Sequence, residues 1–503
     1  MKILLIRPPY DRLKKTAYGP YFPLGLGYLA TSLHDNGFEV RIYNADNASD
    51  KAEYLESGSP FSYRKRMGGL NLYQEELHDN QHPVWAEIEA ALKSFQPDLV
   101  GLTALSVAIG TTSKVSRMCK EHNPNCHIVW GGPHVTVLPD NVLSNPDVDF
   151  AIRGEGEYSL LELCQTLARG GKDFSAIDGL SYRKNKQIVH NKPRAMIEDL
   201  NQIPFPARHL VLFPENYDSP SWGHILGVRG CPYKCTFCSA RALWGKPRYR
   251  SAENIIGEIK QVMTRFKSRD FWLEDDTLTS NRKRALELCQ RIIDLKLKIN
   301  WRGLTRVDCL DDELLDAMKK AGCSSVLLGI ESGSDRILKL LKKGTTVEEI
   351  KRATRLLDKH KLDYAVFFMG GFPQETKEDL LQTLDLMKRI HPIRINFNVF
   401  TPLPGSELYD EIRAGSSMSE DAGWEDLAYC RDGRYYTENI SDQEFERMKN
   451  DILDHVDSYN NSWGVRLRRM IHGKLRLKKR RVIGMVSAKF AKKAPSPFAA
   501  HKK

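Results

Sequence analysis

Short apolar runs alternate with amphipathic segments along the first third of the chain. Between the runs, apolar residues recur at helical spacing, as Leu26, Leu29 and Leu33 do before the turn residues Asn36 and Gly37. This alternation predicts a doubly wound parallel sheet of about five strands with helices on both faces. The predicted strands are residues 2–7, 38–43, 98–102, 127–130 and 148–153.

Polar turns follow these strands, and one long segment breaks the pattern. Ligands of open α/β sheets bind at the carboxyl ends of the strands, so we expect a binding site among the turns. These turns are residues 7–10, 103–106, 131–134 and 154–157. Residues 47–83 are polar and rich in Ser, Gly and Asn, which predicts an irregular insertion.

A second alternating block begins near residue 225 and holds six strand–helix units. Its connections predict a partial or full barrel, whose functional face is the carboxyl end of the strands. The predicted strands are residues 225–228, 270–274, 298–302, 325–330, 364–369 and 394–400, and the helices are 252–266, 282–295, 311–321, 347–360 and 376–390. For residues 170–220 we expect a connector that contains a hairpin at 179–190.

Composition narrows the class of protein. The chain has 503 residues, 41% hydrophobic and 28% charged, which is typical of soluble globular proteins with more than one domain. It has no apolar run of about 18 residues, and its N-terminus is interrupted too soon for a signal peptide. Most of the ten cysteines are scattered. They do not resemble a disulfide framework, so we expect a cytoplasmic protein in a reducing environment.

Positive charge is concentrated at the C-terminus. The formal net charge is +11, and residues 464–503 contain fourteen Lys and Arg but no Asp or Glu, which leaves −3 for residues 1–463. Apolar residues recur there at helical spacing: Trp463, Leu467, Met470, Ile471 and Leu475. Such a helix can lie on an anionic membrane, follow nucleic-acid phosphates, or be a solvated tail. Because the stripe is apolar, membrane contact is favoured over nucleic acid, which is not expected as a partner, and the solvated tail stays open as the alternative.

Three cysteines with the spacing C-x3-C-x2-C give the strongest chemical signal: Cys231, Cys235 and Cys238. Three such thiolates can ligate three irons of a [4Fe–4S] cluster and leave the fourth iron open to a small molecule. A structural zinc site would need a fourth ligand, and His224 precedes the predicted strand on the wrong side. A fully ligated electron-transfer cluster would need a fourth cysteine close by, but Cys289 and Cys309 lie in or beside other predicted elements.

The cysteine motif, with an aromatic residue before its third cysteine, resembles the signature of the radical S-adenosylmethionine (SAM) superfamily. Further motifs at the ends of successive predicted strands follow in the family's order. The resemblance implies that the three cysteines hold the cluster, that its open iron chelates SAM, and that electron transfer yields a 5′-deoxyadenosyl radical. It implies SAM contacts for Phe237, Glu274, Asp275, Arg306, Glu331, Ser332, Gly370 and Gly371.

Each of these residues also has a structural alternative. Asp275 could cap the helix that follows it, and Gly370 could belong to a plain turn. Arg306 could pair with Asp308 or with Asp311. Their appearance in family order behind the cysteine motif favours the SAM site.

The N-terminal block resembles the cobalamin-binding domain that precedes the barrel in some radical SAM proteins. The resemblance lies in residues 7–9 (Arg-Pro-Pro), 23–29, 131–134 (Gly-Gly-Pro-His) and 153–157 (Arg-Gly-Glu-Gly-Glu). It implies cobalamin contacts for Pro9, Thr103, Ser106, Gly131, Gly132 and Glu155. The Asp-x-His-x-x-Gly motif of better-known cobalamin proteins is absent. His134 follows the fourth predicted strand rather than the first, so a loop position near the corrin is favoured over cobalt ligation.

Two alternatives remain for this block. Its glycine-rich turns could hold a nucleotide, although no G-x-G-x-x-G follows the first strand. The fold could also persist without any cofactor.

Together the resemblances imply an α/β protein with five segments. A doubly wound, Rossmann-like cobalamin-binding domain (1–165) and a linker (166–220) precede a radical SAM partial (β/α)6 barrel of TIM type (221–410). A small, mostly helical C-terminal region (411–463) and the basic tail (464–503) follow. Four aromatic residues could close over a substrate or pack a helical domain: Trp424, Tyr429, Tyr435 and Tyr436.

The resemblance implies an enzyme that uses a [4Fe–4S] cluster, SAM and cobalamin, most often to methylate an unactivated carbon of a small-molecule or lipid-like substrate. Oxidative cyclisation, as in the anaerobic magnesium-protoporphyrin monomethyl ester cyclase of the same architecture, is the alternative within the class. A tRNA methylthiotransferase would need three further cluster cysteines, and Cys119, Cys126 and Cys164 lie in or beside predicted helices. A non-catalytic corrinoid- or cluster-binding protein is the alternative outside enzymes. The implied electron donor is a flavodoxin or ferredoxin.

Overall fold

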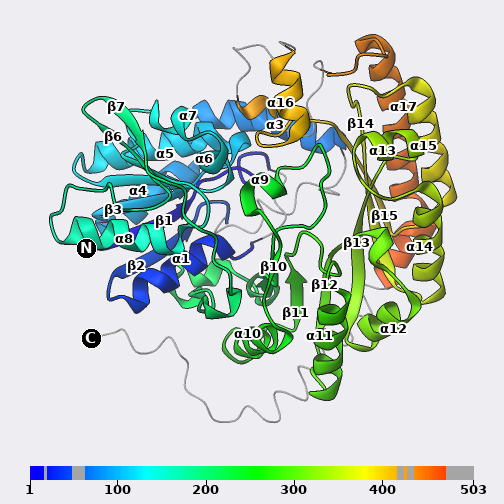
Figure 1. Cartoon of the computed structure of the whole chain (residues 1–503), viewed down its shortest axis with the longest axis horizontal. Helices are drawn as coiled ribbons and strands as arrows, with labels where there is room; N and C mark the ends of the chain where they lie inside the picture. Colours follow the sequence, from blue (N-terminus) through cyan, green and yellow to red (C-terminus); the bar gives the residue numbers. More distant parts are fainter. Residues whose placement is uncertain (16–19, 48–62, 416–423, 428–434, 472–503) are drawn as a thin grey trace.

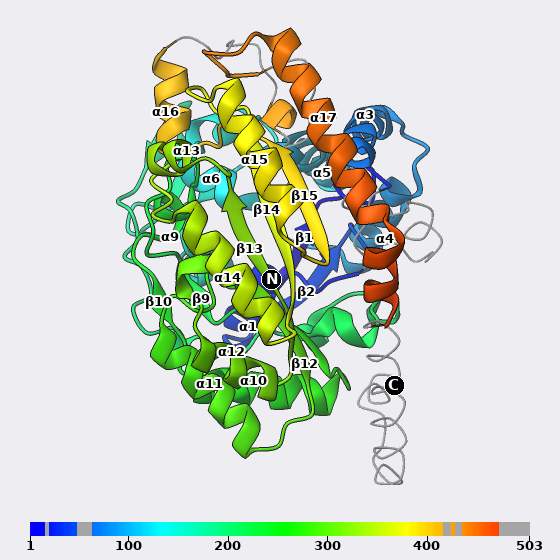
Figure 2. The ribbon, with the colours of Figure 1, turned by 90° about the vertical axis from the view of Figure 1, so that its right-hand side faces the viewer.

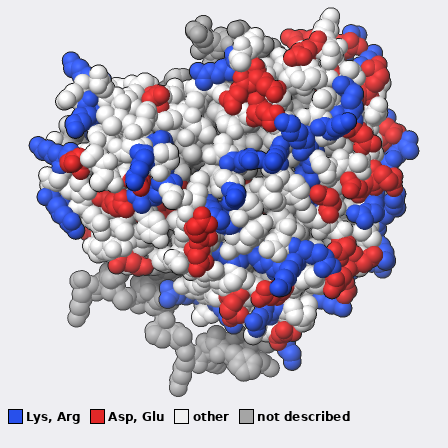
Figure 3. Space-filling view, viewed as in Figure 1, with Lys and Arg blue, Asp and Glu red and all other residues white. Residues whose placement is uncertain are grey.

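The computed structural model describes residues 1–15, 20–47, 63–415, 424–427 and 435–471, without the side chains of residues 65, 66, 425 and 426. Two sheets lie side by side, each flanked by helices (Figure 1). Lys and Arg are interspersed with Asp and Glu over the described part of the face in Figure 3. Among the helices of the described ranges, none combines the length and the apolar character needed to cross a membrane.

The first sheet has seven strands in the order β2-β1-β3-β4-β5-β6-β7. The strands are β1 Lys2–Arg7, β2 Glu39–Asn44, β3 Leu99–Thr103, β4 His127–Gly131, β5 Phe150–Ile152, β6 Leu180–Lys184 and β7 Gln187–His190. The helices of this half are α1 Leu24–Asp35, α3 Tyr63–His78, α4 Pro83–Phe95, α5 Ile109–His122, α6 Pro133–Val137, α7 Pro139–Leu143 and α8 Gly156–Ala168. The first five strands of the order are parallel, which confirms the predicted doubly wound sheet.

Strand β1 shows why its sequence is apolar throughout. Ile3 and Leu5 lie in one hydrophobic core, and Leu4 and Ile6 lie in another on the opposite face. All four side chains have no exposed surface. Successive residues of a strand face opposite sides, so a parallel strand covered on both faces is a continuous apolar run.

Helix α3 corrects the prediction that residues 47–83 form an irregular insertion. Its Leu70 and Tyr73 are buried in the same core as Trp85 of α4. The pattern was obscured because Gly68 and Gly69 interrupt a mostly polar helix, and glycine lowers helix propensity. Residues 48–62 of that segment lie outside the described residues.

The predicted hairpin at 179–190 exists, but it belongs to the first sheet and not to a connector. Strand β6 pairs antiparallel with β5, and β7 pairs with β6. The first sheet therefore reaches His190, inside the predicted linker 166–220. The other domain borders stay predictions.

The second sheet has six parallel strands in the order β15-β14-β13-β12-β11-β8. Its strands are β8 His224–Ile225, β11 Asp270–Leu273, β12 Asn300–Thr305, β13 Cys323–Glu331, β14 Asp363–Gly370 and β15 Arg394–Val399. The covering helices are α10 Ala252–Arg265, α11 Arg282–Asp294, α12 Asp312–Lys320, α13 Asp335–Leu340, α14 Val347–Lys359 and α15 Lys377–Arg389. Strand order follows chain order, so the predicted partial (β/α)6 barrel is confirmed.

The first predicted barrel strand, 225–228, is broken in two. Strand β8 ends at Ile225, and β9 (Val228–Arg229) pairs antiparallel with β10 (Arg248–Tyr249). The amides of Gly227 and Val228 donate to the Asp275 carboxylate at 2.5 and 2.9 Å. Because these amides are taken by a side chain, the backbone leaves the ladder there and directs the following loop away from the sheet.

The C-terminal region is mostly helical, as predicted, with α16 Glu407–Ala414 and α17 Asp442–Asn461. Helix α17 runs along the β15 side of the barrel (Figure 2). The Asn460 side chain accepts from Ile395 N at 3.0 Å and donates to Ile395 O at 2.7 Å. The side-chain amide of Asn460 thus takes the place of a neighbouring strand and pairs with backbone groups at the open edge of β15.

Candidate active site

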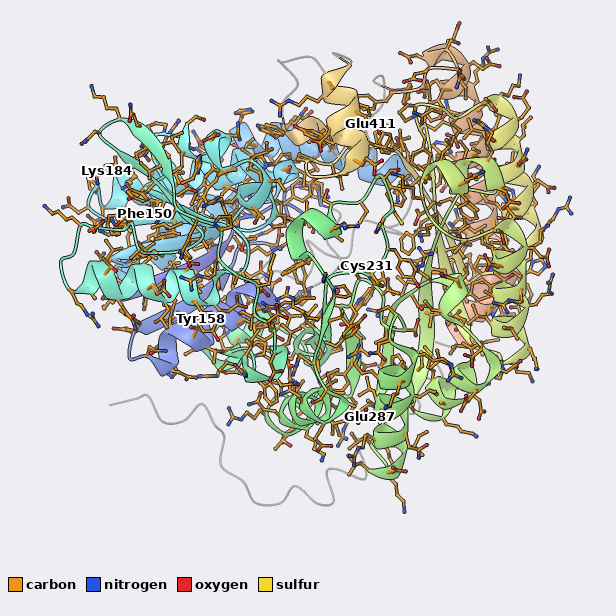
Figure 4. All side chains as sticks on the ribbon, in the orientation of Figure 1. Phe150, Tyr158, Lys184, Cys231, Glu287 and Glu411 are labelled. Carbon is orange, nitrogen blue, oxygen red and sulfur yellow. The ribbon has the colours of Figure 1, made fainter. Side chains whose placement is uncertain are left out.

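The cysteine loop follows β9 and α9 (Ala240–Trp244) follows the loop, between the two sheets. Figure 4 shows Cys231 in this central position. The amide of Thr236 donates to Leu341 O at 3.0 Å, which ties the loop to the segment after α13. Phe237 packs against an apolar cluster, with its ring centroid 6.2 Å from that of Phe372. Phe237 therefore anchors the loop, and its contact with SAM stays a prediction.

The three thiols are accessible and influence one another. Cys231 and Cys235 are half-buried and Cys238 is exposed. Burial is the main reason that the pKa of Cys238 is raised to about 11. Negative charge on Cys235, Asp276 and Cys231 also raises this pKa, whereas the hydrogen bond from the amide of Ala240 lowers it. Metal binding must displace these thiol protons.

The donor set fits a cube-shaped cluster better than a single ion. Within the described ranges, no three His, Cys, Asp or Glu side chains are grouped to hold one metal ion. A [4Fe–4S] cube does not require such a group, because each cysteine binds a different iron. His224, the candidate fourth zinc ligand, instead has Nδ1 2.5 Å from Glu274 Oε1.

Arg306 is held against the cysteine loop. Its guanidinium donates to both carboxylate oxygens of Asp308, at 2.9 and 3.1 Å, and to Lys343 O at 2.5 Å. It lies 3.5 Å from the ring centroid of Tyr233 and 4.0 Å from Cys235 Sγ. The pairing with Asp308 is thus real, yet it also orients Arg306 toward a cluster cysteine.

Three neighbouring carboxylates after β11 have different environments. Glu274 is paired with His224 and remains partly exposed. Asp275 is 1% exposed and also accepts from Arg284 at 3.1 Å, so its carboxylate has a structural role. Its contact with SAM stays a prediction. Asp276 is exposed and acts electrostatically on Cys238, and the next residue, Thr277, has its hydroxyl 3.5 Å from Cys231 Sγ.

Glu331, at the end of β13, has an unusual backbone. Its φ is 69°, and the register with β14 shifts between Gly329 and Glu331. Its carboxylate accepts from Lys343 Nζ at 2.7 Å. Ser332 is fully buried and its hydroxyl accepts from Ser334 N at 3.1 Å. Ser332 therefore stabilises a turn, whereas Glu331 lies near Cys235 and acts on it electrostatically.

Gly370 and Gly371 are required by packing. A Cβ on Gly370 would lie 2.9 Å from Leu380 and Phe397, and one on Gly371 would lie 2.8 Å from Phe445 of α17. Gly371 also has a φ of 90°, a conformation that favours glycine. Their predicted contact with SAM stays a prediction beside this structural role.

A cavity of about 270 Å³ opens at the first sheet on the side of the cysteine loop. Its lining is mostly apolar, with Leu5, Leu26 and Leu29 along one side. Of the residues predicted to contact cobalamin, it includes Thr103, Gly131, Gly132 and Glu155, while Ser106 and Pro9 are not in its lining. An apolar cavity lined by backbone glycines can accept the flat, bulky edge of a large cofactor.

Glu155 belongs to an ion network that joins the cavity to the cysteine loop. Its carboxylate accepts from Arg229, from Arg248 at 2.7 Å and from Ile197 N at 2.7 Å, and Arg229 also pairs with Glu157. Burial alone would raise the pKa of Glu155, but the two arginines hold it below its ordinary value. Glu155 thus stabilises the cavity wall, and its contact with cobalamin stays a prediction.

His134 is not available as a cobalt ligand in this structure. Its Nδ1 lies 3.0 Å from Ser106 Oγ and its Nε2 lies 2.9 Å from Asn141 Oδ1. Its ring also meets Trp424 edge-on at 5.0 Å. Trp424 therefore packs on this loop. Tyr435 accepts a hydrogen bond from Lys449 of α17. Tyr429 lies outside the described residues.

The matches to known families divide the chain as the structure does. Residues 225–387 match the radical SAM superfamily and residues 71–164 match the B12 binding domain. An uncharacterized methyltransferase of Pyrococcus horikoshii is 33% identical over 414 residues, which are 82% of this chain and 83% of that protein. The chain therefore belongs to the radical SAM superfamily, as a member with an N-terminal B12-binding domain.

Two further relatives agree with this assignment. The anaerobic magnesium-protoporphyrin IX monomethyl ester cyclase of Rubrivivax gelatinosus is 28% identical, over 82% of this chain and 70% of that protein. The cytidylyl-2-hydroxyethylphosphonate methyltransferase of Streptomyces wedmorensis is 26% identical, over 82% of each.

The solved structures share the fold over most of the chain. The radical SAM methyltransferase TsrM from Kitasatospora setae, with cobalamin and a [4Fe–4S] cluster bound, has a TM-score of 0.68 at 17% identity and covers 92% of this chain and 90% of its own. The cobalamin-dependent radical enzyme OxsB has a TM-score of 0.66 at 18% identity, over 89% of this chain and 66% of its own. This chain is a methyltransferase-like radical SAM enzyme whose cofactors are a [4Fe–4S] cluster, SAM and cobalamin.

The sequence left three neighbours of the site unnoticed. Arg229 and Trp244 line the cavity beside the first sheet, and Lys343 is buried against Glu331. Arg229 stands two positions before the first cluster cysteine, so its place in the chain was a usable signal. Lys343 carried none, because buried and exposed lysines look alike in one sequence.

Proposed function

We propose that this protein transfers a methyl group from SAM, by way of cobalamin, to an unactivated carbon of a small-molecule or lipid-like substrate. When bound, the cluster with SAM supplies a radical that removes a substrate hydrogen, and cobalamin carries the methyl group. The observation that supports the pairing of these cofactors is Arg229. Its guanidinium lines the cavity beside the first sheet, and its backbone leads into the cysteine loop.

The chain's own residues would bind, orient and enclose the reactants. Cys231, Cys235 and Cys238 would hold the cluster, with the Arg306 guanidinium 4.0 Å from Cys235 Sγ. Thr103, Gly131 and Gly132 would hold the cofactor in the cavity. The substrate would then bind between the barrel mouth and the first sheet, where both cofactors are accessible.

Oxidative cyclisation is the second candidate, favoured by the 28% identity to the Rubrivivax gelatinosus cyclase. The products from SAM separate the two. A methyl transfer that also uses the radical produces both S-adenosylhomocysteine and 5′-deoxyadenosine. Cyclisation produces 5′-deoxyadenosine without demethylated SAM. Incubation of the reduced, fully reconstituted protein with SAM, followed by chromatography, should reveal both products, and 5′-deoxyadenosine alone would contradict methyl transfer.

We propose a flavodoxin or ferredoxin as the electron donor and an anionic membrane as a second partner. Residues 463–471 are helical beyond α17. Arg468 and Arg469 bond to His391 O and Asn460 O of the body, whereas Trp463 is 78% exposed, Met470 48% and Ile471 45%. Apolar side chains that point away from the body, ahead of a tail without acidic residues, suit an anionic lipid surface.

Vesicle sedimentation tests this membrane contact. The full chain should bind phosphatidylserine-containing vesicles, and a Trp463→Ser, Ile471→Ser variant should bind at least about tenfold more weakly, because burial of apolar surface contributes to such binding. Binding to phosphatidylcholine vesicles should be weak. Equal binding by the variant, or a preference for RNA over vesicles, would contradict the proposal.

A further inference from the structure

Lys343 is a buried lysine beside the cysteine loop. Its side chain is 7% exposed, and its Nζ lies 2.7 Å from Glu331 Oε1. Lysine is seldom this buried unless it is paired, because an isolated buried charge is costly. The ion pair with Glu331 therefore fixes the position of the Lys343 side chain in the barrel mouth.

The segment that carries Lys343 is fastened to the cysteine loop by its backbone. Thr236 N donates to Leu341 O at 3.0 Å, and Arg306 donates to Lys343 O at 2.5 Å while its Nη1 lies 4.0 Å from Cys235 Sγ. The segment around Lys343 is thus held beside Cys235 by two hydrogen bonds, one of them from the arginine that reaches the thiol.

The backbone around Glu331 is shaped to keep the pair in place. Glu331 has a φ of 69°, a conformation that is unfavourable for a residue other than glycine and persists only where the surrounding structure holds it. A Cβ on Gly329 would lie 2.6 Å from Glu331 Oε1 and 3.2 Å from Lys343 Nζ. A residue without a side chain is therefore needed at 329 for the carboxylate and the ammonium to meet.

We propose that Lys343, held in position by Glu331, raises the reduction potential of the [4Fe–4S] cluster bound at Cys231, Cys235 and Cys238. Reduction adds one electron from the external donor to the cluster and makes it more negative by one charge. A buried cation beside one ligand stabilises that reduced form, because electrostatic interactions are strong in a site of low polarity. The inference rests on cluster binding by the family and is independent of methyl transfer.

A redox titration of the full-length, anaerobically reconstituted protein without SAM, followed by electron paramagnetic resonance, tests this role. In Lys343→Met the equilibrium constant for reduction should fall about tenfold, which corresponds to about 59 mV for one electron. In Glu331→Gln it should rise, because the neutralising carboxylate is gone. The double variant should lie between the two. Lys342→Met is the matched control, since Lys342 is half-exposed and pairs with Glu407.

A purely structural role would not move the two single variants in opposite directions. The proposal is overturned if both shift the same way, or if neither differs from Lys342→Met. If Lys343→Met does not retain the cluster, an unchanged potential in Glu331→Gln overturns it. SAM cleavage and methylation in the wild-type protein do not depend on this result, so the two proposals fail separately.

Discussion

Asp275 illustrates how one carboxylate can serve the fold while its neighbours face the site. It accepts from two amides of the segment that leads to the cysteine loop and pairs with Arg284 inside the barrel. Asp276, one position later, is exposed. The two aspartates therefore make a matched pair for substitution.

We expect Asp275→Asn to lower the free energy of unfolding by about 3–5 kcal/mol, because loss of one charge leaves a buried partner unpaired. Arg284 is the partner affected. Urea unfolding of the apoprotein measures the change. Asp276→Asn is the control and should leave stability within about 0.5 kcal/mol of wild type, since it is an exposed position. Equal stability of both variants would contradict the structural role of Asp275.

At the scale of elements, α1 offers a direct test of the cofactor cavity. Gly25 lines the cavity, and a Cβ there would meet no atom within 4 Å. Gly25→Leu should therefore leave the apoprotein as stable as wild type or more so, since glycine disfavours helix by about 1 kcal/mol. The larger side chain should reduce cobalamin binding at least about tenfold, because a clash in a binding site costs more than 1.4 kcal/mol.

Equilibrium dialysis with hydroxocobalamin measures this affinity. Gly68→Leu in α3 is the matched control, because Gly68 is also a helical glycine with no atom within 4 Å of its Cβ and it is not in the cavity lining. Unchanged cobalamin binding by Gly25→Leu would place the cofactor elsewhere.

Regular elements were predictable where one physical rule decided them. Strand β1 is apolar on both faces, and helix α14 begins with the capping pair Thr346 and Glu349, so each was visible in sequence. The cysteine motif was also visible in the sequence, because its spacing and the order of the strand-end motifs after it can be identified without the fold. Helix α3 was not, because tertiary burial of Leu70 and Tyr73 outweighs its weak propensity.

The directions and partners of side chains could not be predicted from the sequence. Spacing placed Asp275 at the right strand end, but it could not show that the chain breaks after Ile225 and presents two free amides to it. Nor could it show that Glu155 meets Arg229 from the other half of the molecule. Contacts between residues far apart in sequence depend on the complete fold.

At the scale of the whole molecule, the Glu155 network predicts a pH dependence. Its folded pKa is below the ordinary value, so the stability it contributes is present above about pH 4.3 and is lost as the pH falls through the folded pKa. Glu155→Gln should therefore lower the free energy of unfolding at pH 7 and reduce the decline of that free energy as the pH falls below about 4.3.

Chemical unfolding at a series of pH values checks this expectation. Glu162→Gln is the control, since Glu162 pairs with Arg194 at a more exposed position of α8. If the free energy of unfolding of Glu155→Gln falls with acid as steeply as that of wild type, the network does not couple stability to pH.

The central claim is that one chain holds an iron–sulfur cluster at its cysteine loop and cobalamin beside its first sheet. Metal analysis of the anaerobically reconstituted protein, with SAM cleavage measured on the same sample, tests it most directly. We predict about four irons and about one cobalt per chain, with formation of 5′-deoxyadenosine. Replacement of Cys231, Cys235 and Cys238 by Ala should remove the iron and the cleavage but retain the cobalt. Cleavage that survives this replacement, or a wild-type protein without cobalt, would contradict the account.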